Sequence, residues 1–222
     1  MHCRHIMHTD IQQTLPTVTH SRRLWGLDWR RTTPWTFDDI RVESAVFDEA
    51  LPFMREHYAS IFGSQPNECR FLASPMTPAK RRFCDESDVF LFRDAGRTIG
   101  LMMANPADWS TYYMRSVAVL PEYRDRRLLT RFMTASYAPL REAGVERIEG
   151  ECSPANAPMM RMLVGQGFLV TSTANSERWG ATVRFTKFLS EEAESVFLRQ
   201  FNSVTPTRKA MSPTVCNERS TS

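Results

Sequence analysis

The sequence predicts an α/β (α+β) fold, in which a mixed, mostly antiparallel central sheet of six to seven strands carries helices on both faces. Segments that alternate apolar and polar residues, as half-buried strands do, recur along the chain. Other segments repeat apolar residues at the spacing of one helix face. Strands come first in a run and later alternate with helices, an order typical of a mixed sheet covered by helices.

The first half of the chain predicts a strand, two helices and three consecutive strands. Apolar and polar residues alternate over 40–43, which indicates the first strand. Apolar residues at helical spacing predict the helix that follows; they are Phe47, Leu51, Met54, Tyr58 and Ile61. A second helix is expected at 78–86. Segments 89–92 and 98–104 then predict an antiparallel hairpin, and 112–120 adds a third strand.

The second half predicts helices that alternate with strands. The helix at 128–143 ends before Gly144 and has one side formed by Leu129, Phe132, Met133, Ser136 and Leu140. After it we expect, in order, a strand at 147–152, a helix at 156–165, a strand after the turn at 165–168, a strand at 181–188 and a helix at 191–201.

We expect one domain with a tail at each end. A chain of 222 residues, 42% of them hydrophobic, can close one sizeable core but not two. Residues 1–37 are interpreted as a partly disordered N-terminal arm, 38–201 as the folded domain and 202–222 as a disordered C-terminal tail. In the arm, tryptophans lie among arginines. We favour packing of these aromatic residues on the domain over the alternative, a nucleic-acid contact.

Charge and cysteine usage exclude several classes of function. The formal net charge of +3 lies in the tails, which leaves 38–201 at −2, without the basic face that nucleic-acid binding needs. The five cysteines are scattered, so we expect neither a disulfide framework nor a metal site. No apolar run approaches the length of a membrane helix, and no membrane partner is expected. These features favour a cytoplasmic protein.

Two segments carry the most specific signal. One is Val117-Ala-Val-Leu-Pro-Glu-Tyr-Arg124, followed by a helix. The other is Glu151-Cys-Ser-Pro-Ala-Asn156, followed by a helix that ends in Gly-Gln-Gly-Phe168. With the order of elements over 38–190, they resemble the two central motifs of the GNAT (N-acetyltransferase) superfamily. The resemblance implies that 38–201 is an acyltransferase domain that uses acetyl-CoA, or another acyl-CoA, as co-substrate.

The resemblance also implies where the coenzyme would bind. In this family the strand end splays from its neighbour at a bulge, and its backbone pairs with the pantetheine arm; here this implies Val117, Ala118 and Val119. Asn156 belongs to the second motif. The turn after the proline closes around the pyrophosphate at a helix N-terminus. Its positions here are Arg124, Arg126, Arg127, Leu128 and Leu129. Arg127 and Leu129 replace glycine-type residues, whereas the arginines offer charge to phosphate.

Glu151 and Tyr113 are the candidates for proton transfer. Transfer of an acyl group to an amine needs a base for the amine proton and an acid for the leaving thiolate. Glu151 lies near the end of its strand where the cleft should open, and Tyr113 lies on the strand that leads to Val117. Leu163 replaces the family's frequent tyrosine acid. Cys152 has no histidine placed to activate it and is interpreted as a small core residue.

The predicted function is transfer of an acetyl or other acyl group from acyl-CoA to a primary amine of a small molecule or peptide. Two alternatives stay open. An acyl carrier protein could be the donor and dock on the face Arg124–Arg131, or the chain could be a non-catalytic binding or sensing module. The oligomeric state is also open. Carboxylates that could attract a cationic amine are Asp85, Glu86, Asp88 and Glu177.

Overall fold

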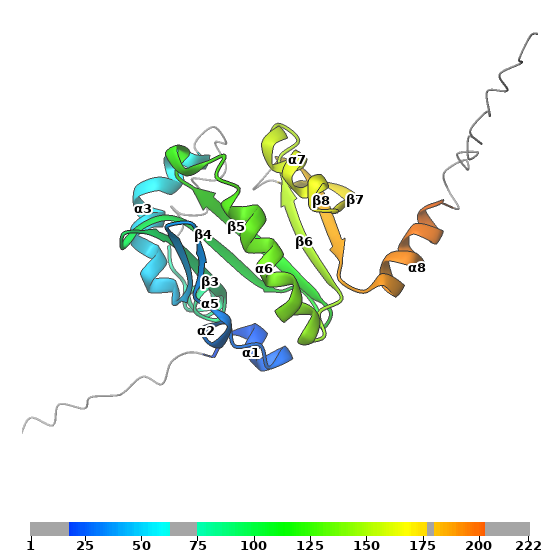
Figure 1. Ribbon diagram of the computed structural model, residues 1–222, viewed down its shortest axis with the longest axis horizontal. Coiled ribbons are helices and arrows are strands. Elements are labelled where there is room, and N and C mark those ends of the chain that lie inside the picture. Colours follow the sequence, from blue (N-terminus) through cyan, green and yellow to red (C-terminus); the bar gives the residue numbers. More distant parts are fainter. Residues whose placement is uncertain (1–17, 63–74, 177–179, 203–222) are drawn as a thin grey trace, which may run out of the picture.

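The computed structural model describes residues 18–62, 75–176 and 180–202 (Figure 1). Its centre is an eight-stranded sheet of order β1-β2-β3-β4-β5-β6-β8-β7. The strands are β1 (Trp35–Phe37), β2 (Ile40–Ala45), β3 (Asp88–Asp94), β4 (Arg97–Pro106), β5 (Thr111–Val119), β6 (Arg147–Cys152), β7 (Leu169–Ser176) and β8 (Gly180–Phe188). All neighbours pair antiparallel except β5 and β6, which are parallel.

The mixed, mostly antiparallel sheet predicted from the sequence is confirmed, although its strand count is one too low. The additional strand is β1, which pairs through three residues with β2. A segment this short shows little alternation, so its sequence alone does not distinguish it from a loop. The sheet therefore begins at Trp35, three residues before the expected start of the domain. The domain limits at residues 38 and 201 stay predictions.

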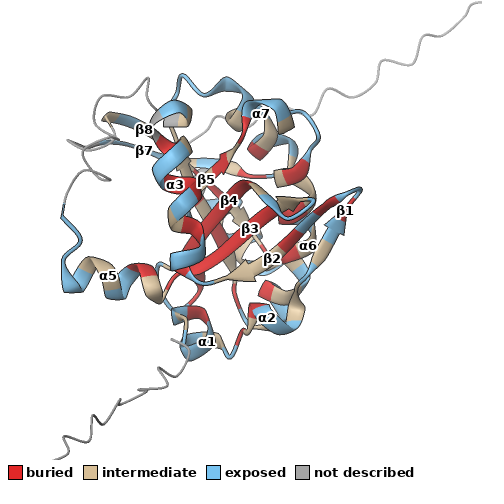
Figure 2. Ribbon diagram, turned by 90° about the vertical axis from the view of Figure 1, so that its left-hand side faces the viewer, coloured by how far each residue is buried: buried red, intermediate tan, exposed pale blue. Residues whose placement is uncertain are grey.

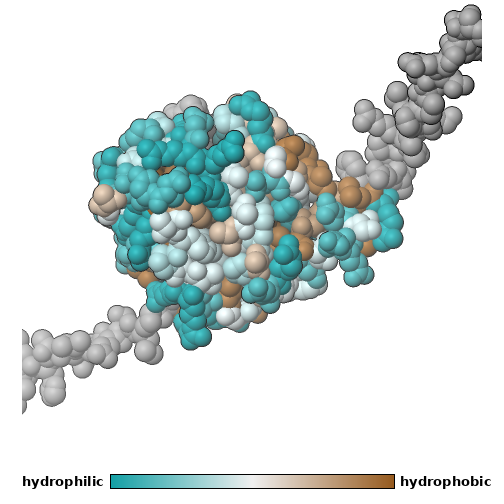
Figure 3. All heavy atoms as spheres, viewed as in Figure 1, coloured by the Kyte–Doolittle hydropathy of each residue, from teal (hydrophilic) through white to brown (hydrophobic). Residues whose placement is uncertain are grey.

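Helices cover both faces of the sheet. They are α1 (His20–Trp25), α2 (Trp29–Thr32), α3 (Phe47–Phe62), α5 (Pro78–Asp85), α6 (Leu128–Glu142), α7 (Ala157–Gly165) and α8 (Glu191–Asn202), with a 3₁₀ turn η1 (Pro121–Tyr123). Figures 1 and 2 show α3 on one face of the sheet and α6 on the other. The helix α8 projects from the body at the β8 end, where hydrophobic residues gather on the surface (Figure 3).

The core lies where α6 packs on β3, and its residues are the buried ones in Figure 2. Phe132 of α6 is 1% exposed, and its ring centroid lies 4.8 Å from that of Phe90 and 5.7 Å from that of Phe92. The buried side of α6 consists of Leu128, Phe132, Met133, Ser136 and Leu140. Leu128 replaces the expected Leu129, because it continues the four-residue spacing of Phe132, Ser136 and Leu140.

The tryptophans of the N-terminal segment pack on the domain, as the favoured interpretation proposed. Trp29 is 3% exposed and lies edge-on to Phe90, with 5.1 Å between ring centroids. Trp35 packs against Phe132 at 5.5 Å, and the indole N–H of Trp25 donates to the carbonyl oxygen of Trp109 at 2.8 Å. Because these rings bury large apolar areas, they hold the described part of this segment, residues 18–37, against the sheet.

A buried carboxylate fixes the N-terminal helices to the sheet. Oδ2 of Asp88 on β3 accepts hydrogen bonds from Ser21 Oγ at 2.5 Å, Trp29 Nε1 at 3.0 Å and Tyr112 Oη at 3.1 Å. Oδ1 has no hydrogen-bond partner among the described residues. Burial raises the pKa of Asp88 to about 6, and the hydrogen bonds that neighbouring side chains donate to it oppose that rise only in part.

The free energy of unfolding of the wild type should fall as pH rises past the pKa of Asp88, and we expect Asp88→Asn to abolish this fall. The folded pKa of about 6 exceeds the ordinary 3.8, so this group stabilises fully below pH 3.8 and its contribution is lost as pH rises through 6. The difference corresponds to about 3 kcal/mol. Asparagine stays neutral, and its oxygen can accept from the same donors. Urea unfolding of both proteins at about pH 4 and about pH 7 measures this difference; parallel pH profiles would contradict it.

Within the described ranges, none of the helices has the length and apolar composition needed to cross a lipid bilayer.

Candidate active site

The sheet opens between β5 and β6. The parallel pairing of these strands runs from Thr111 with Arg147 to Met114 with Gly150 and then stops. Beyond this point β5 stays paired with β4 as far as Val119, and β6 stays paired with β8 as far as Cys152. The two strands therefore diverge, and the facing backbone edges beyond Met114 and Gly150 are not paired with each other.

A bulge in β5 lies at the point of divergence. The register between β4 and β5 shifts so that Met103 faces Ser116 and Ala104 faces Met114, which leaves Arg115 as the additional residue. A bulge increases the local twist and bends its strand. The strand therefore turns away from β6, in agreement with the splay expected from the sequence motif.

The backbone groups of Val117 and Val119 face the open edge. The N–H of Leu120 donates to the carbonyl oxygen of Ile99 on β4 at 2.9 Å, so residue 120 faces β4. Because successive residues of a strand point their N–H and C=O groups to opposite sides, Ala118 also faces β4, whereas Val117 and Val119 face the gap. Of the three residues expected to bind the coenzyme through their backbone, Val117 and Val119 therefore face the open edge, whereas Ala118 faces β4 within the sheet.

The connection from β5 to α6 has a glycine-like backbone without a glycine. Arg127 has φ 55° and ψ 25°, the left-handed region, and Asp125 has φ 64°. Residues other than glycine adopt this backbone conformation at a cost of about 1 kcal/mol. The turn geometry that a glycine would favour is therefore adopted by Arg127, which occupies the position before the first residue of α6.

The N-terminus of α6 has free hydrogen-bond donors. Helix geometry leaves the N–H groups of Leu128, Leu129 and Thr130 without intrahelical acceptors, and no side chain in the described parts of the chain caps this end of the helix. The first intrahelical bond runs from the N–H of Arg131 to the carbonyl oxygen of Arg127 at 3.0 Å. These N–H groups and the helix dipole together favour an anion at this position.

The four arginines of this connection have different surroundings. Arg131 Nη1 donates to Asp38 Oδ2 at 2.7 Å, and Arg126 Nη1 lies 3.7 Å from Asp39 Oδ1. Arg124 Nε donates to the carbonyl oxygen of Val119 at 3.2 Å. Arg127 is exposed, and its side chain has no partner in the described part of the chain. Arg124 and Arg127 are therefore the arginines without an acidic partner in that part.

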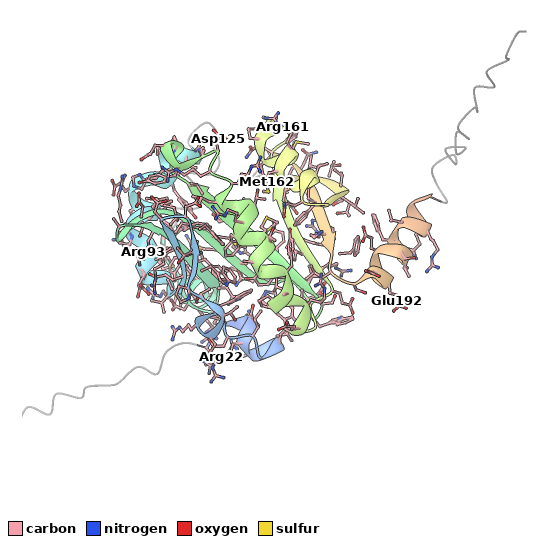
Figure 4. All side chains as sticks on the ribbon, in the orientation of Figure 1. Arg22, Arg93, Asp125, Arg161, Met162 and Glu192 are labelled. Atoms are coloured by element: carbon pink, nitrogen blue, oxygen red, sulfur yellow. The ribbon has the colours of Figure 1, made fainter. Side chains whose placement is uncertain are left out.

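The two motif segments lie at the same end of the molecule. Asp125, in the connection to α6, and Arg161, on α7, mark this end in Figure 4. Asn156 caps α7 by accepting a hydrogen bond from the N–H of Met159 at 3.2 Å. This structural role accounts for an asparagine at the start of the helix. Its expected contact with the coenzyme stays a prediction.

Glu151 is part of a charged network on β6 and β8. Its Oε1 accepts from Arg184 Nη2 at 2.6 Å and Nε at 2.9 Å, and its Oε2 accepts from Thr182 Oγ1 at 3.0 Å. Arg184 Nη1 also lies 3.5 Å from Glu149 Oε2. Both carboxylate oxygens of Glu151 are therefore occupied by hydrogen-bond donors from β8.

Tyr113 lies beside this network, because its register partner on β6 is Glu149. Burial raises the pKa of the Tyr113 phenol, and the negative charge of Glu151 raises it further. The guanidinium carbon of Arg115 lies 5.7 Å from the centre of the Tyr113 ring. The structure therefore brings the two predicted proton-transfer residues into one electrostatic environment; their catalytic roles stay predictions.

Sequence reasoning missed several residues around this site. Arg184 pairs with Glu151 across 33 positions of sequence, and Asp38 pairs with Arg131 across 93. Tyr58 of α3 shares a 2.7 Å hydrogen bond with the Ser116 hydroxyl at the bulge. Nothing local in the sequence signals these long-range pairs. The strand alternation that put Glu149 and Glu151 on one face also applies to β8 and could have suggested Arg184.

The carboxylates expected to attract a cationic amine are largely engaged elsewhere. Asp85 accepts from Arg81 Nε at 2.8 Å, and Glu86 lies 2.5 Å from Arg23 Nη2. Asp88 is buried, and Glu177 lies outside the described residues.

Burial raises the pKa of the Cys152 thiol, which suits a packed residue better than a nucleophile. The described residues contain no group of three or more side chains suited to a metal ion.

A hollow of about 530 Å³ lies away from this site. It is lined by His20, Arg23, Leu24, Pro106, Ala107 and Asp108. Pro106 ends β4 beside the start of β5, so the hollow is at the opposite end of β5 from the splay. Its size does not make it the active-site candidate, because the unpaired strand edge and the helix N-terminus both lie at the other end.

Comparisons with known proteins agree with this geometry. Residues 51–168, more than half of the chain, match the family model described as Acetyltransferase (GNAT) family. None of the curated proteins compared matches the chain.

Solved acetyltransferase structures share the fold at low sequence identity. Ard1 from Thermoplasma volcanium has 14% identity and a TM-score of 0.53, with 69% of this chain and 99% of that chain covered. A GNAT family acetyltransferase from Elizabethkingia anophelis, solved with acetyl-CoA bound, has 11% identity and a TM-score of 0.50, covering 68% and 99%. The ribosomal-protein-S5-alanine acetyltransferase from Vibrio fischeri has 15% identity and a TM-score of 0.50, covering 72% and 98%.

Proposed function

This chain belongs to the GNAT acetyltransferase family, and we propose that it transfers an acetyl group from acetyl-CoA to a primary amine of a small molecule or peptide. The observation that carries the proposal is the unpaired edge of β5, which leads directly to the uncapped N-terminus of α6. An extended pantetheine arm can pair with such an edge as an additional strand. Its pyrophosphate would then reach the free N–H groups of the helix.

In the proposed reaction the neutral amine attacks the thioester carbonyl carbon. A C–N bond forms, the C–S bond breaks, the amine loses one proton and the coenzyme thiolate gains one. We assign the backbone groups of Val117 and Val119 to orienting the donor, Glu151 to the amine proton and Tyr113 to the thiolate. Because both oxygens of Glu151 already accept hydrogen bonds from Arg184 and Thr182, positioning of the amine against the thioester contributes a larger share of the rate.

The carrier-protein alternative is less well supported by charge. An acidic carrier protein needs a strongly basic docking surface. Two of the four arginines at the start of α6 face Asp38 and Asp39, and Asp125 lies in the same connection. The non-catalytic alternative rests on the replaced glycine-type positions, Arg127 and Leu129, and on Leu163 at the position of the family's tyrosine acid. The left-handed conformation of Arg127 weakens the first of these two arguments and leaves the second in place.

Calorimetric titration with acetyl-CoA tests the donor, and Val119→Pro tests the strand edge. Proline removes the N–H of Val119, which faces the gap and not β4. We expect the wild type to bind acetyl-CoA and the variant to bind about tenfold more weakly, since one hydrogen bond of about 1–1.5 kcal/mol is lost. Thermal unfolding should change little.

Ala118→Pro is the matched control, because its N–H faces β4 and its loss breaks a bond within the sheet. This variant should be the less stable of the two. Wild-type protein that fails to bind acetyl-CoA would contradict the proposed function. Unchanged affinity in Val119→Pro would show that the donor does not pair with this edge.

A further inference from the structure

The turn between β1 and β2 faces the start of α6 with two consecutive carboxylates. Asp38 and Asp39 form the two-residue turn that connects Phe37 to its register partner Ile40. Asp38 has φ 58°, a conformation that glycine adopts at less cost. An acidic side chain therefore occupies a position where local geometry favours glycine. This placement brings both carboxylates to arginines that lie far along the chain.

The contacts hold two arginine side chains in place. The Arg131 guanidinium donates to Asp38 at 2.7 Å and stacks 5.1 Å from the centre of the Phe37 ring. The pKa of the Asp38 carboxyl is lowered, chiefly by its hydrogen bond to Arg131. A guanidinium that is both paired and stacked loses freedom to reach another anion.

The second pair joins the same kinds of group at a longer distance. Arg126 Nη1 lies 3.7 Å from Asp39 Oδ1, and the Arg126 guanidinium lies 5.0 Å from the centre of the Tyr123 ring. The surface around this end of the molecule is hydrophilic (Figure 3). Both pairs are exposed to solvent, so each contributes modestly and weakens with salt.

The charges at this end nearly cancel. Five arginines, at positions 97, 124, 126, 127 and 131, carry five positive charges, whereas Asp38, Asp39, Glu122 and Asp125 carry four negative charges. The difference is one positive charge. A phosphate group at the N-terminus of α6 would meet Arg124 and Arg127 as the guanidinium groups without an acidic partner among the described residues. The same balance gives an acidic protein little attraction to this face.

We propose that Asp38 and Asp39 determine donor specificity: they hold Arg131 and Arg126, limit phosphate contacts to Arg124 and Arg127, and disfavour an acidic carrier protein as donor. This inference rests on the proposed function where it concerns the donor. The ion pairs themselves do not depend on that function. Removing the two carboxylates should free both arginines and increase affinity for any phosphorylated ligand at this helix start.

The test compares Asp38→Asn/Asp39→Asn with the wild type. Asparagine keeps the size of aspartate and tolerates the left-handed conformation, so the turn is retained. The control is Asp48→Asn, because Asp48 of α3 forms an exposed pair with Arg81 of α5 at 2.8 Å, in a different part of the surface. Calorimetry at low and moderate salt would measure binding of coenzyme A, inorganic pyrophosphate and an acidic holo-carrier protein.

We expect the double variant to bind coenzyme A and pyrophosphate about fivefold more tightly than the wild type at low salt. Its affinity should also depend more steeply on salt, carrier-protein binding should increase, and Asp48→Asn should match the wild type. Unchanged or weaker binding of both phosphorylated ligands by the double variant would overturn the inference. A gain in binding free energy in Asp48→Asn that reaches half the gain of the double variant would also overturn it, because one charge removed elsewhere would then have the same effect as each carboxylate of this turn.

The outcomes separate this inference from the proposed function. If pyrophosphate binding increases in the double variant while neither protein binds coenzyme A, the carboxylates control the anion site and the proposed donor is wrong. If the wild type binds coenzyme A and the double variant gains no affinity for either phosphorylated ligand, the donor assignment stands and the inference is wrong. If neither protein binds either ligand, both are wrong.

Discussion

Arg127→Glu should weaken acetyl-CoA binding about 100-fold. Arg127 is exposed, has no side-chain partner in the described segments and immediately precedes the free N–H groups of α6. A charge-assisted hydrogen bond to phosphate contributes about 1.5–3 kcal/mol, and the glutamate adds repulsion. A total of about 3 kcal/mol corresponds to the stated factor. Calorimetric titration at low salt measures it directly.

Two other arginine variants serve as controls, because they separate a specific phosphate contact from a general effect of charge. Arg131→Gln should reduce affinity less than threefold, because Asp38 already holds that side chain. Arg199→Glu makes the same charge reversal on α8, which projects away from the start of α6 (Figure 1), and should leave affinity unchanged. Equal losses in all three variants would indicate a general charge effect and would refute a specific phosphate contact at Arg127.

Phe132→Ala should lower the free energy of unfolding by about 4 kcal/mol. Phe132 is 1% exposed and contacts Trp35, Phe90 and Phe92 with ring centroids 4.8–5.7 Å away. Truncating a fully buried phenylalanine costs about 3–5 kcal/mol, because the transfer free energy is lost and a cavity remains. Urea unfolding monitored by tryptophan fluorescence measures the change.

Phe132→Leu provides the comparison for this site. Leucine fills most of the space, so its cost should be about 1–1.5 kcal/mol. A loss below about 1 kcal/mol in the alanine variant would mean that α6 is not packed on β3 as described. Because α6 also presents the N–H groups of the proposed phosphate site, stability should be measured before affinity in any variant of this helix.

The sequence predicted the elements from residue 40 onward because each is long enough to show its period. The strand at 147–152 was predicted with the limits the structure gives, and the limits of α6 differ by one residue. The helices α1 and α2 were not predicted. They have six and four residues, too few for an apolar repeat, although Thr19 and Asp28 cap them and are residues typical of helix starts.

The candidate site was predictable where it depends on local sequence and not where it depends on folding. The resemblance of the strand motif to the family implied a splay, and the end of pairing after Met114 and the bulge at Arg115 agree with it. The partners of the charged groups depend on which distant segments the fold brings together. From the sequence alone, Glu151 is a carboxylate available to act as a base. In the structure it accepts hydrogen bonds from Arg184 and Thr182, which lie on a strand some 30 residues away.

The seam between β5 and β6 has a mechanical consequence. The larger part of the sheet, β1 to β5, is joined to β6, β8 and β7 through a parallel ladder that ends at Met114 and Gly150. Beyond that rung nothing in the sheet itself resists separation of the two halves. A ligand lying along the open edge would supply hydrogen bonds in place of the missing strand pairing and connect the two halves of the sheet. Binding of the ligand would then determine how rigidly the two halves move together.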